Sequence, residues 1–486
     1  MSSMPRQPWT SFIGGGWSGA DSSRDFEIGD PGRSGEIASR YRTAGAEDAR
    51  RAVRAAAEAF PAWSQTPAAT RANHIYDLID LWRGRIDAVA EIVTREMGKP
   101  LGESRSEAAR AVEEMRFWAG QALRLGERTF ESTRANTEAY VIRQPLGPVA
   151  AISPWNFPIL TPIRKVVPAL VCGCTVVLKP ALQAPGASVH LMQMLQEVGL
   201  PAGAANLVIG GGGEVGDALV RDPAIAGVTF TGSTEVGLRI GVSAAERNAR
   251  VQLEMGGKNA AVVADYADIA RAADEIVRAA FAVSGQRCTA VSRVVVLESD
   301  RTALEEAIVE RAEALKVGYG MEAGVQMGPL VSRDQLQKVE RYVEMARAGQ
   351  GRVLTGGKRG QDGGFYYAPT VITDVRPASP LATDEIFGPV LVIIPVPDFE
   401  AAIAVNNEVR YGLTSSVFTD DMNFAHAFTM RSQAGMVHVN HGTTSEGHLP
   451  FGGWKDSGQG AFGIGDTAVD FYTTPKAVYR MYRDIA

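Results

Sequence analysis

Residues 149–180 read VAAISPWNFPILTPIRKVVPALVCGCTVVLKP. Two short apolar runs, 149–152 and 175–179, enclose a segment of helix length over 159–171. Short apolar runs that alternate with helices are typical of βαβ units, whose parallel strands form a sheet covered by helices on both faces. The sequence therefore predicts an α/β fold.

The same alternation extends beyond this stretch in both directions. It restarts after Gly256 and Gly257, which indicates a second α/β domain reaching to about residue 460. Further strands are expected at 206–209, 227–231, 251–253, 260–263 and 293–297, and extended edge segments at 137–144 and 471–482. Helices are expected at 46–60, 68–97 with a weak point near Gly84, 103–123, 188–198, 215–220 and 269–283.

Composition excludes several classes of protein. The chain has 486 residues, with 49 Lys and Arg against 55 Asp and Glu, so a basic surface for nucleic acid is not expected. The longest apolar run, 166–178, is too short to cross a membrane. The first residues lack the pattern of a secretion signal, and three cysteines cannot form a disulfide framework, so a cytoplasmic location is expected. The six histidines show no metal-ligand spacing, so no metal is expected.

Two glycine-containing loops lie where expected strands turn into helices. The first holds Gly212 and Gly216, and the second is Phe230-Thr231-Gly232-Ser233. Backbone amides at such helix starts can bind a pyrophosphate. The first loop has the spacing GxGxxxG, so on its own it is equally compatible with an ordinary turn.

Four polar side chains occur at positions suited to chemistry. Cys288 follows Arg287 in a small polar loop, where the guanidinium would favour the thiolate. Glu254 ends an expected strand and could serve as a general base, and Asn156 lies in a turn between two prolines and could donate to an oxyanion. Lys179 closes a strand at the ligand-bearing edge of the sheet. Three of the four have a simpler alternative: a turn cap for Glu254, an Asx turn for Asn156 and a solvated strand end for Lys179.

Taken in order, these segments resemble the aldehyde dehydrogenase superfamily over nearly the whole chain. The matching motifs are PWNFP at 154–158, KPA at 179–181, FTGS at 230–233, LEMGGK at 253–258, GQRC at 285–288, EIFGP at 385–389 and PFGG at 450–453. The resemblance implies a Rossmann-like cofactor domain, an α/β catalytic domain and a small β oligomerisation element.

The resemblance also implies roles for individual residues. Cys288 would be the nucleophile, Asn156 with the Cys288 backbone N–H the oxyanion hole, and Glu254 the base that activates water to release the acid. The cofactor would be NAD or NADP. Its implied binding residues are Ile152, Trp155, Lys179, Gly212, Gly216, Phe230, Gly232, Ser233, Glu385 and Phe387.

Two departures from the family pattern carry information. Many NAD-linked members have a glutamate three residues after the lysine, whereas this chain has Leu182, so NADP should be better tolerated. Many relatives carry a second glutamate after the glycine that corresponds to Gly460, whereas this chain continues Ala461-Phe462, so proton transfer should depend on Glu254 and water.

The expected substrate is a small anionic aldehyde, such as 2-oxoglutarate semialdehyde or succinate semialdehyde. Arg164, eight residues after Asn156, should face the substrate tunnel, and Arg287 precedes the nucleophile, so two guanidiniums could hold one anion. An interdomain salt bridge is the alternative for Arg164. The alternative functions are a dehydrogenase for neutral or aromatic aldehydes, a coenzyme A-acylating dehydrogenase and an inactive structural homologue.

The family pattern implies three structural units. Residues 1–123 and 146–257 would form the NAD(P)-binding domain, 258–460 the catalytic domain, and 124–145 with 461–486 the oligomerisation element. An exposed edge strand is a physical reason for chains to associate. We therefore expect a homodimer or homotetramer.

Overall fold

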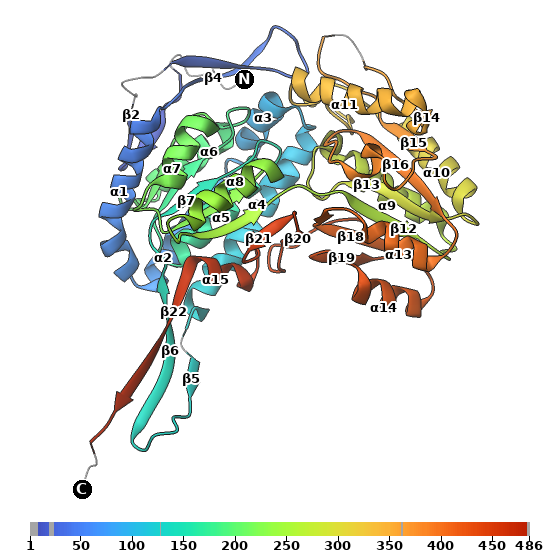
Figure 1. The fold of residues 1–486 in the computed structure, drawn as a ribbon. Helices are drawn as coiled ribbons and strands as arrows, with labels where there is room; N and C mark the ends of the chain where they lie inside the picture. Colours follow the sequence, from blue (N-terminus) through green and yellow to red (C-terminus); the bar gives the residue numbers. More distant parts are fainter. Residues whose placement is uncertain (1–7, 19–23, 127, 361–362, 484–486) are drawn as a thin grey trace.

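The computed structural model describes residues 8–18, 24–126, 128–360 and 363–483. Figure 1 shows two lobes, each built around a sheet, and a long arm of strands that projects from the first lobe. The predicted α/β class is confirmed. The outer ends of the expected first and third units, residues 1–7 and 484–486, lie outside the described part of the chain.

An eight-stranded sheet forms the centre of the first lobe. Its strands, in spatial order, are β2 (Gly16–Ser18), β1 (Ser11–Ile13), β9 (Ala205–Leu207), β8 (Val176–Lys179), β7 (Val149–Ile152), β10 (Gly227–Thr231), β11 (Arg250–Glu254) and β21 (Gly458–Gly460). The five strands from β9 to β11 are parallel, whereas β1 and β21 join antiparallel at the two sides. Because β21 already belongs to this sheet, the chain returns to the first lobe before residue 460.

Helices cover both faces of this sheet, as the βαβ pattern predicts. Val149 and Ala151 pack in one hydrophobic cluster, and Ala150 and Ile152 in another, because successive strand residues point to opposite faces. The helices of the first face are α2 (Ala68–Arg83), α3 (Ile86–Met97), α4 (Leu101–Gln121), α5 (Leu160–Val171) and α6 (Gly186–Glu197), and those of the second are α1 (Ala46–Gln65), α7 (Asp217–Arg221) and α8 (Thr234–Ala245). The weak point expected near Gly84 is the break between α2 and α3.

A seven-stranded sheet forms the second lobe. Its order is β14 (Arg352–Thr355), β15 (Thr370–Thr373), β16 (Val390–Val396), β13 (Val291–Leu297), β12 (Asn259–Val263), β18 (Thr414–Phe418) and β19 (Met436–Val439), all parallel except β14. Its helices are α9 (Ile269–Phe281), α10 (Arg301–Ala314), α11 (Arg333–Met345), α12 (Pro380–Thr383), α13 (Phe399–Asn407) and α14 (Met422–Arg431). Small two-stranded ladders pair β3 (Asp25–Gly29) with β4 (Ile37–Arg42), and β17 (Tyr411–Gly412) with β20 (Trp454–Lys455).

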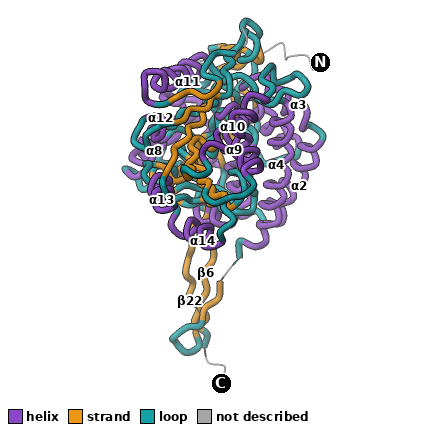
Figure 2. The backbone as a smooth tube through the Cα atoms, turned by 90° about the vertical axis from the view of Figure 1, so that its right-hand side faces the viewer, coloured by secondary structure: helices purple, strands orange, loops and turns teal. Residues whose placement is uncertain are grey.

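The projecting arm is a three-stranded antiparallel sheet (Figures 1 and 2). Its strands are β22 (Thr473–Met481), β6 (Thr137–Pro145) and β5 (Arg128–Phe130). The strand expected at 137–144 is confirmed. The strand expected from residue 471 begins two residues later, because Phe471 and Tyr472 are both buried and belong to the short helix α15 (Val469–Tyr472).

Short turns complete the secondary structure: η1 (Ala122–Arg124), η2 (Gly212–Gly216), η3 (Ala282–Gly285), η4 (Ala346–Gln350) and η5 (Asp466–Ala468). No helix within the described ranges has the length and hydropathy that a bilayer crossing requires.

Two glycines at helix positions should respond oppositely to substitution by alanine. Gly98 caps α3 at φ +91°, and a Cβ there would lie 2.6 Å from Pro329 Cγ, whereas a Cβ at Gly120 in α4 would meet no neighbouring atom within 4 Å. We expect Gly98→Ala to lower the free energy of unfolding by about 1–3 kcal/mol. Gly120→Ala should raise it by about 0.5–1 kcal/mol. Denaturant titration measures both, and equal effects would contradict the packing described.

Candidate active site

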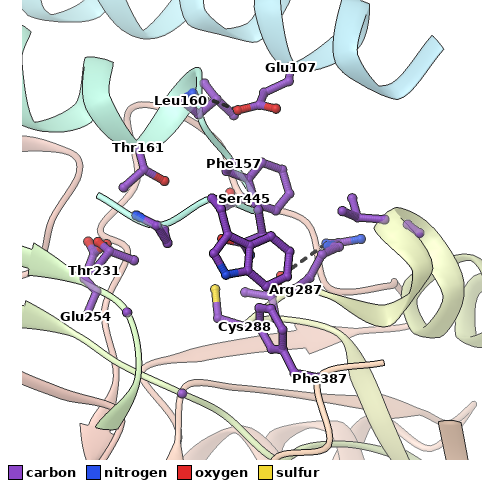
Figure 3. A pocket seen from close by; sticks show the side chains of 18 of the residues that line it. Glu107, Phe157, Leu160, Thr161, Thr231, Glu254, Arg287, Cys288, Phe387 and Ser445 are labelled. Carbon is purple, nitrogen blue, oxygen red and sulfur yellow. Dashed lines mark hydrogen bonds between the residues drawn. The ribbon is translucent and has the colours of Figure 1, made fainter. Parts of the chain in front are cut away.

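A cavity of about 420 Å³ is lined by residues of both lobes. Its walls include α4, the turn before α5, the ends of β10 and β11, and the loop before β13. Cys288, Glu254 and Asn156 all line it, and Figure 3 shows Cys288, Glu254 and Arg287 around the same space. Three side chains singled out from distant parts of the sequence therefore meet in one place.

Cys288 lies shortly after a turn of unusual backbone conformation. The helix expected to reach residue 283 ends at Phe281, and Val283 and Ser284 both adopt φ values near +56°, which non-glycine residues rarely do. Glu103 of α4 accepts the Val283 N–H, and Ser284 Oγ donates to the Gly328 carbonyl at 2.7 Å. These contacts from neighbouring elements hold the strained turn that positions the thiol.

The surroundings of Cys288 disfavour its thiolate. Burial raises the pKa of the thiol to about 12, and the negative charges of Glu254 and Glu385 act in the same direction. Arg287 and Arg164 oppose this effect but do not overcome it. Arg287 thus favours the thiolate, as expected from the sequence, but burial and the two carboxylates outweigh both guanidiniums.

Asn156 is buried in the turn between β7 and α5. Its side-chain Nδ2 donates to the Gln286 carbonyl at 2.8 Å, two residues before the nucleophile candidate, and its own carbonyl accepts from Lys99 Nζ at 2.8 Å. An amide nitrogen carries two hydrogens, so one remains for an oxygen in the cavity. The Asx-turn alternative does not describe this side chain, because its hydrogen bond reaches the other lobe.

Glu254 is the last residue of β11 and is nearly buried. Its Oε2 accepts from Thr231 Oγ1 at 2.7 Å, and a Cβ at Gly463 would lie only 1.7 Å from its Oε1. The carboxylate therefore occupies space that only a glycine at position 463 leaves open. It is directed by neighbouring groups rather than free to cap a turn.

Arg164 lines the cavity, but its charge already has a partner. Its Nε and Nη2 donate to both oxygens of the buried Glu114 of α4, at 2.6–3.0 Å. Glu114 belongs to the same lobe, so the pair is not an interdomain bridge. Arg164 was expected to face the cavity because it lies eight residues, or about two helical turns, after Asn156. That argument was wrong, because Asn156 precedes α5 and is not part of the helix.

Arg287 also lines the cavity, and it differs from Arg164 in its partners. Its Nη2 donates to the Thr443 carbonyl at 2.9 Å and to Thr289 Oγ1 at 3.2 Å. Its Nε is buried and has no acceptor among the residues that the structure describes.

Residues of the expected cofactor site fall into two neighbouring groups. A second cavity of about 580 Å³ is lined by Ile152, Lys179, Gly212 and Gly216. Lys179 is not a solvated strand end: it is buried, its Nζ donates to the Pro180 and Gly210 carbonyls, and burial lowers its pKa to about 8. The glycine run forms one wide turn, η2, so the expected helix begins only at Asp217.

The other group lines the first cavity beside Cys288. Trp155 and Phe387 contact edge to face, with ring centroids 5.5 Å apart, and Phe387 has a left-handed backbone at φ 60°. Glu385 is half-buried over Gly256 and accepts the Gly257 N–H at 3.0 Å. Ser233 lines this cavity and directly precedes α8. Its side chain does not cap the helix, so the first backbone N–H groups of α8 are available as donors on this side.

Phe230 is placed differently from the expectation. Its side chain is buried in the hydrophobic cluster beneath the sheet and is not among the residues that line either cavity. A Cβ at Gly232 would lie 2.5 Å from the Phe230 ring, so the glycine is required for packing as well as for approach to a ligand.

Comparison with known proteins agrees with this geometry. The model of the aldehyde dehydrogenase family matches residues 17–478. The chain belongs to the aldehyde dehydrogenase family. It is 37% identical to the alpha-ketoglutaric semialdehyde dehydrogenase of Bacillus subtilis over 476 residues, which cover 97% of this chain and 98% of that protein. It is 35% identical to the glutarate-semialdehyde dehydrogenase of Pseudomonas aeruginosa over 453 residues, covering 93% and 94%.

A solved structure shows the same fold. Betaine aldehyde dehydrogenase from Staphylococcus aureus, in complex with NAD+, superimposes with a TM-score of 0.95 at 31% identity, covering 98% of this chain and 95% of that one. The resemblance stated from the motifs is thus confirmed for the family, the fold and the class of reaction.

Sequence reasoning missed the charged face of α4. Glu103, Glu107, Arg110 and Glu114 follow one another at helical intervals of four, three and four residues, and the first three line the cavity of this dehydrogenase. Such a charged stripe on a helix is usually a solvated face. The other side of α4 also packs against the protein, since Ala108, Ala111, Val112 and Met115 are buried. A helix with apolar residues beside its charged stripe leaves little of its surface for water, and this signal could have shown that the stripe is not a solvated face.

The state of the thiol can be tested by its reactivity. We expect alkylation of Cys288 by iodoacetamide in the cofactor-free enzyme to accelerate continuously from pH 7 to pH 10, because the pKa lies above this range. Glu254→Gln should increase the rate at pH 8, since it removes a negative neighbour. Peptide mass spectrometry follows each cysteine separately, and the buried Cys172 and Cys174 serve as internal controls. An alkylation rate of Cys288 that levels off below pH 8 would contradict the raised pKa of this thiol.

Proposed function

We propose that this protein oxidises a small anionic aldehyde to its carboxylic acid, with NAD or NADP as the cofactor. The observation that carries the proposal is the meeting of Cys288, Asn156 and Glu254 in one cavity. The names of the two semialdehyde dehydrogenases to which the chain is similar support an aldehyde that ends in a carboxylate.

The described residues fit a dinucleotide. Lys179 offers a buried ammonium at the end of β8, and a Cβ at Gly212 or Gly213 would meet no protein atom within 4 Å, so a ligand can approach the backbone there. The start of α8 behind Ser233 suits a pyrophosphate, because helix N-termini attract anions. Trp155, Glu385 and Phe387 would hold the nicotinamide half. When bound, the cofactor supplies the acceptor for the hydride that leaves the substrate.

The nucleotide preference follows from the position after the lysine. Leu182 is packed against the hydrophobic cluster of the first lobe and offers no acceptor for a ribose hydroxyl. We therefore propose that NADP is accepted as well as NAD.

Cys288 would begin the reaction by adding to the aldehyde carbon. Its proton must leave first, since the thiol is neutral in the resting site, and Glu254 is the nearby carboxylate that can accept it. The S–C bond then forms while the carbonyl oxygen gains a negative charge. The free N–H of Asn156 and the Cys288 backbone N–H would stabilise this oxygen.

After loss of the hydride, the acyl group remains on Cys288 as a thioester. Glu254 would first pass the proton of the thiol to solvent and then take a proton from water as the water oxygen attacks the acyl carbon. The C–S bond breaks, the sulfur regains a proton from Glu254, and the acid leaves. A carboxylate held beside the thiol by Thr231 favours release to water over transfer to coenzyme A.

We propose the three units expected from the sequence as the domains of this enzyme, with the catalytic domain ending before β21, and the projecting arm as the contact between copies in a homodimer or homotetramer. Tyr479 and Met481 of β22 are more than two-thirds exposed, which supports the arm as an association surface. We propose a cytoplasmic location, supported by the three free cysteines.

Substitution of the nucleophile tests the proposal. Cys288→Ala should abolish formation of reduced nicotinamide with succinate semialdehyde while cofactor binding, measured by fluorescence titration, is retained. Asn156→Ala should lower kcat by about 10²–10³-fold, the typical loss for one oxyanion donor. Cys172→Ala, away from the cavity, is the matched control. Acid formation by Cys288→Ala, or a requirement for coenzyme A in the unmodified enzyme, would refute the proposal.

A further inference from the structure

Two arginines that line the cavity have no carboxylate bound to them among the described residues. Beside Lys338, which donates to the Glu385 carbonyl, four cations line it: Lys99, Arg110, Arg164 and Arg287. Lys99 is paired with Glu107 at 2.6 Å and Arg164 with Glu114. Within the described part of the chain, Arg110 and Arg287 form no ion pair with a carboxylate. Lys338 also donates to a carbonyl, but that carbonyl belongs to Glu385, one of the residues expected to hold the nicotinamide half of the cofactor. Arg110 and Arg287 are therefore the guanidiniums that we consider for an anionic substrate.

The acids nearest to the two arginines are occupied elsewhere. Both oxygens of Glu103 accept the Val283 N–H, at 3.1 and 3.2 Å, and burial raises the pKa of this carboxyl group. Glu114 is bound by Arg164 on both oxygens. An anionic ligand would thus give these two guanidiniums the direct carboxylate contact that no described residue makes with them.

Both arginines reach the same short loop. Arg287 Nη2 donates to the Thr443 carbonyl, and Arg110 Nη2 donates to the carbonyl and the Oγ of Ser445, at 2.8 and 3.2 Å. Two residues of extended chain span at most about 7 Å, so the two guanidiniums approach one region of the cavity wall. Neutral carbonyl acceptors hold them there, and a carboxylate is a stronger acceptor for a guanidinium.

The placement of α4 fits the far end of a substrate. Figure 3 shows α4, marked by Glu107, across the cavity from Cys288, while Arg287 lies beside the thiol. Arg110 is one helical turn after Glu107 on the same side of α4. The aldehyde carbon must be at Cys288, so a carboxylate at the other end of the molecule points away from it, toward this wall and the loop at 443–445.

We propose that Arg110 and Arg287 together bind the terminal carboxylate of the substrate, and that Arg164 mainly fixes α5 to α4 through Glu114. The inference rests on the proposed function, because it assumes an anionic aldehyde. Arg287 Nε has no acceptor within the described ranges of the chain, so turning this guanidinium toward a carboxylate breaks no hydrogen bond to them at that atom. Arg110 is a specificity-determining residue in this arrangement.

The test compares succinate semialdehyde with a neutral analogue of the same shape, in which an isopropyl group replaces the carboxylate. In the unmodified enzyme, kcat/KM should be higher for the acidic aldehyde. Arg110→Gln should lower kcat/KM for the acidic aldehyde about 10–100-fold, as expected for one charge-assisted contact, mainly through KM. The value for the neutral analogue should change less than about 3-fold, and Arg110→Lys should recover part of the loss.

Two further variants separate specificity from structure. Arg116→Gln replaces an exposed arginine of the same helix and should leave both substrates unaffected. Arg164→Gln leaves Glu114 buried without its partner, so it should lower the melting temperature and reduce activity equally with both aldehydes. Binding of succinate to Cys288→Ala, measured calorimetrically, should weaken with Arg110→Gln by a similar factor.

The outcomes distinguish the inference from the proposed function. An unmodified enzyme that prefers the acidic aldehyde, with Arg110→Gln keeping that preference, would overturn the inference and leave the proposed function standing. If Arg164→Gln lost the preference for the acidic aldehyde while Arg110→Gln kept it, the inference would also be overturned and the proposed function would stand. An unmodified enzyme that does not prefer the acidic aldehyde would refute the proposed substrate class and the inference with it.

Discussion

The buried ion pair between Lys99 and Glu107 is the interaction on which the arrangement of the active site depends. Both side chains are at most 2% exposed, and each uses its remaining capacity on the backbone. Lys99 donates to the Asn156 carbonyl, and Glu107 Oε1 accepts the N–H groups of Ile159 and Leu160 at the start of α5. Loss of either partner would leave an uncompensated buried charge, so the pair holds the turn that carries Asn156 with little freedom.

The other acids of α4 extend the same principle across the cavity. Glu103 reaches the strained turn before Cys288, and Glu114 fixes Arg164. One helix of the first lobe therefore positions groups on both sides of the reacting centre. Rigid placement of this kind lets an enzyme stabilise a developing charge without reorganisation during the reaction.

Burial of so many ionisable groups has an electrostatic consequence for the nucleophile. Burial and the carboxylates of Glu254 and Glu385 raise the pKa of the Cys288 thiol, and a neutral thiol reacts more slowly with oxidants and alkylating agents than a thiolate does. Reaction then requires a base next to the sulfur, and Glu254 is held where it can serve both the thiol and the later water. The same carboxylate thus restrains the thiol at rest and assists it during the reaction.

The sequence by itself determined the two α/β lobes, the projecting strands and the identity of Cys288, Glu254, Asn156 and Lys179, because strand and helix periodicities and short motifs are local properties of the chain. It could not reveal that Arg164 is paired, that Phe230 faces the core or that Arg110 lines the cavity. Those facts depend on Glu114, on the packing of the first sheet and on a loop more than 300 residues away, respectively. Only the tertiary structure decided them, since the charge and exposure of a side chain are set by the neighbours that folding brings to it.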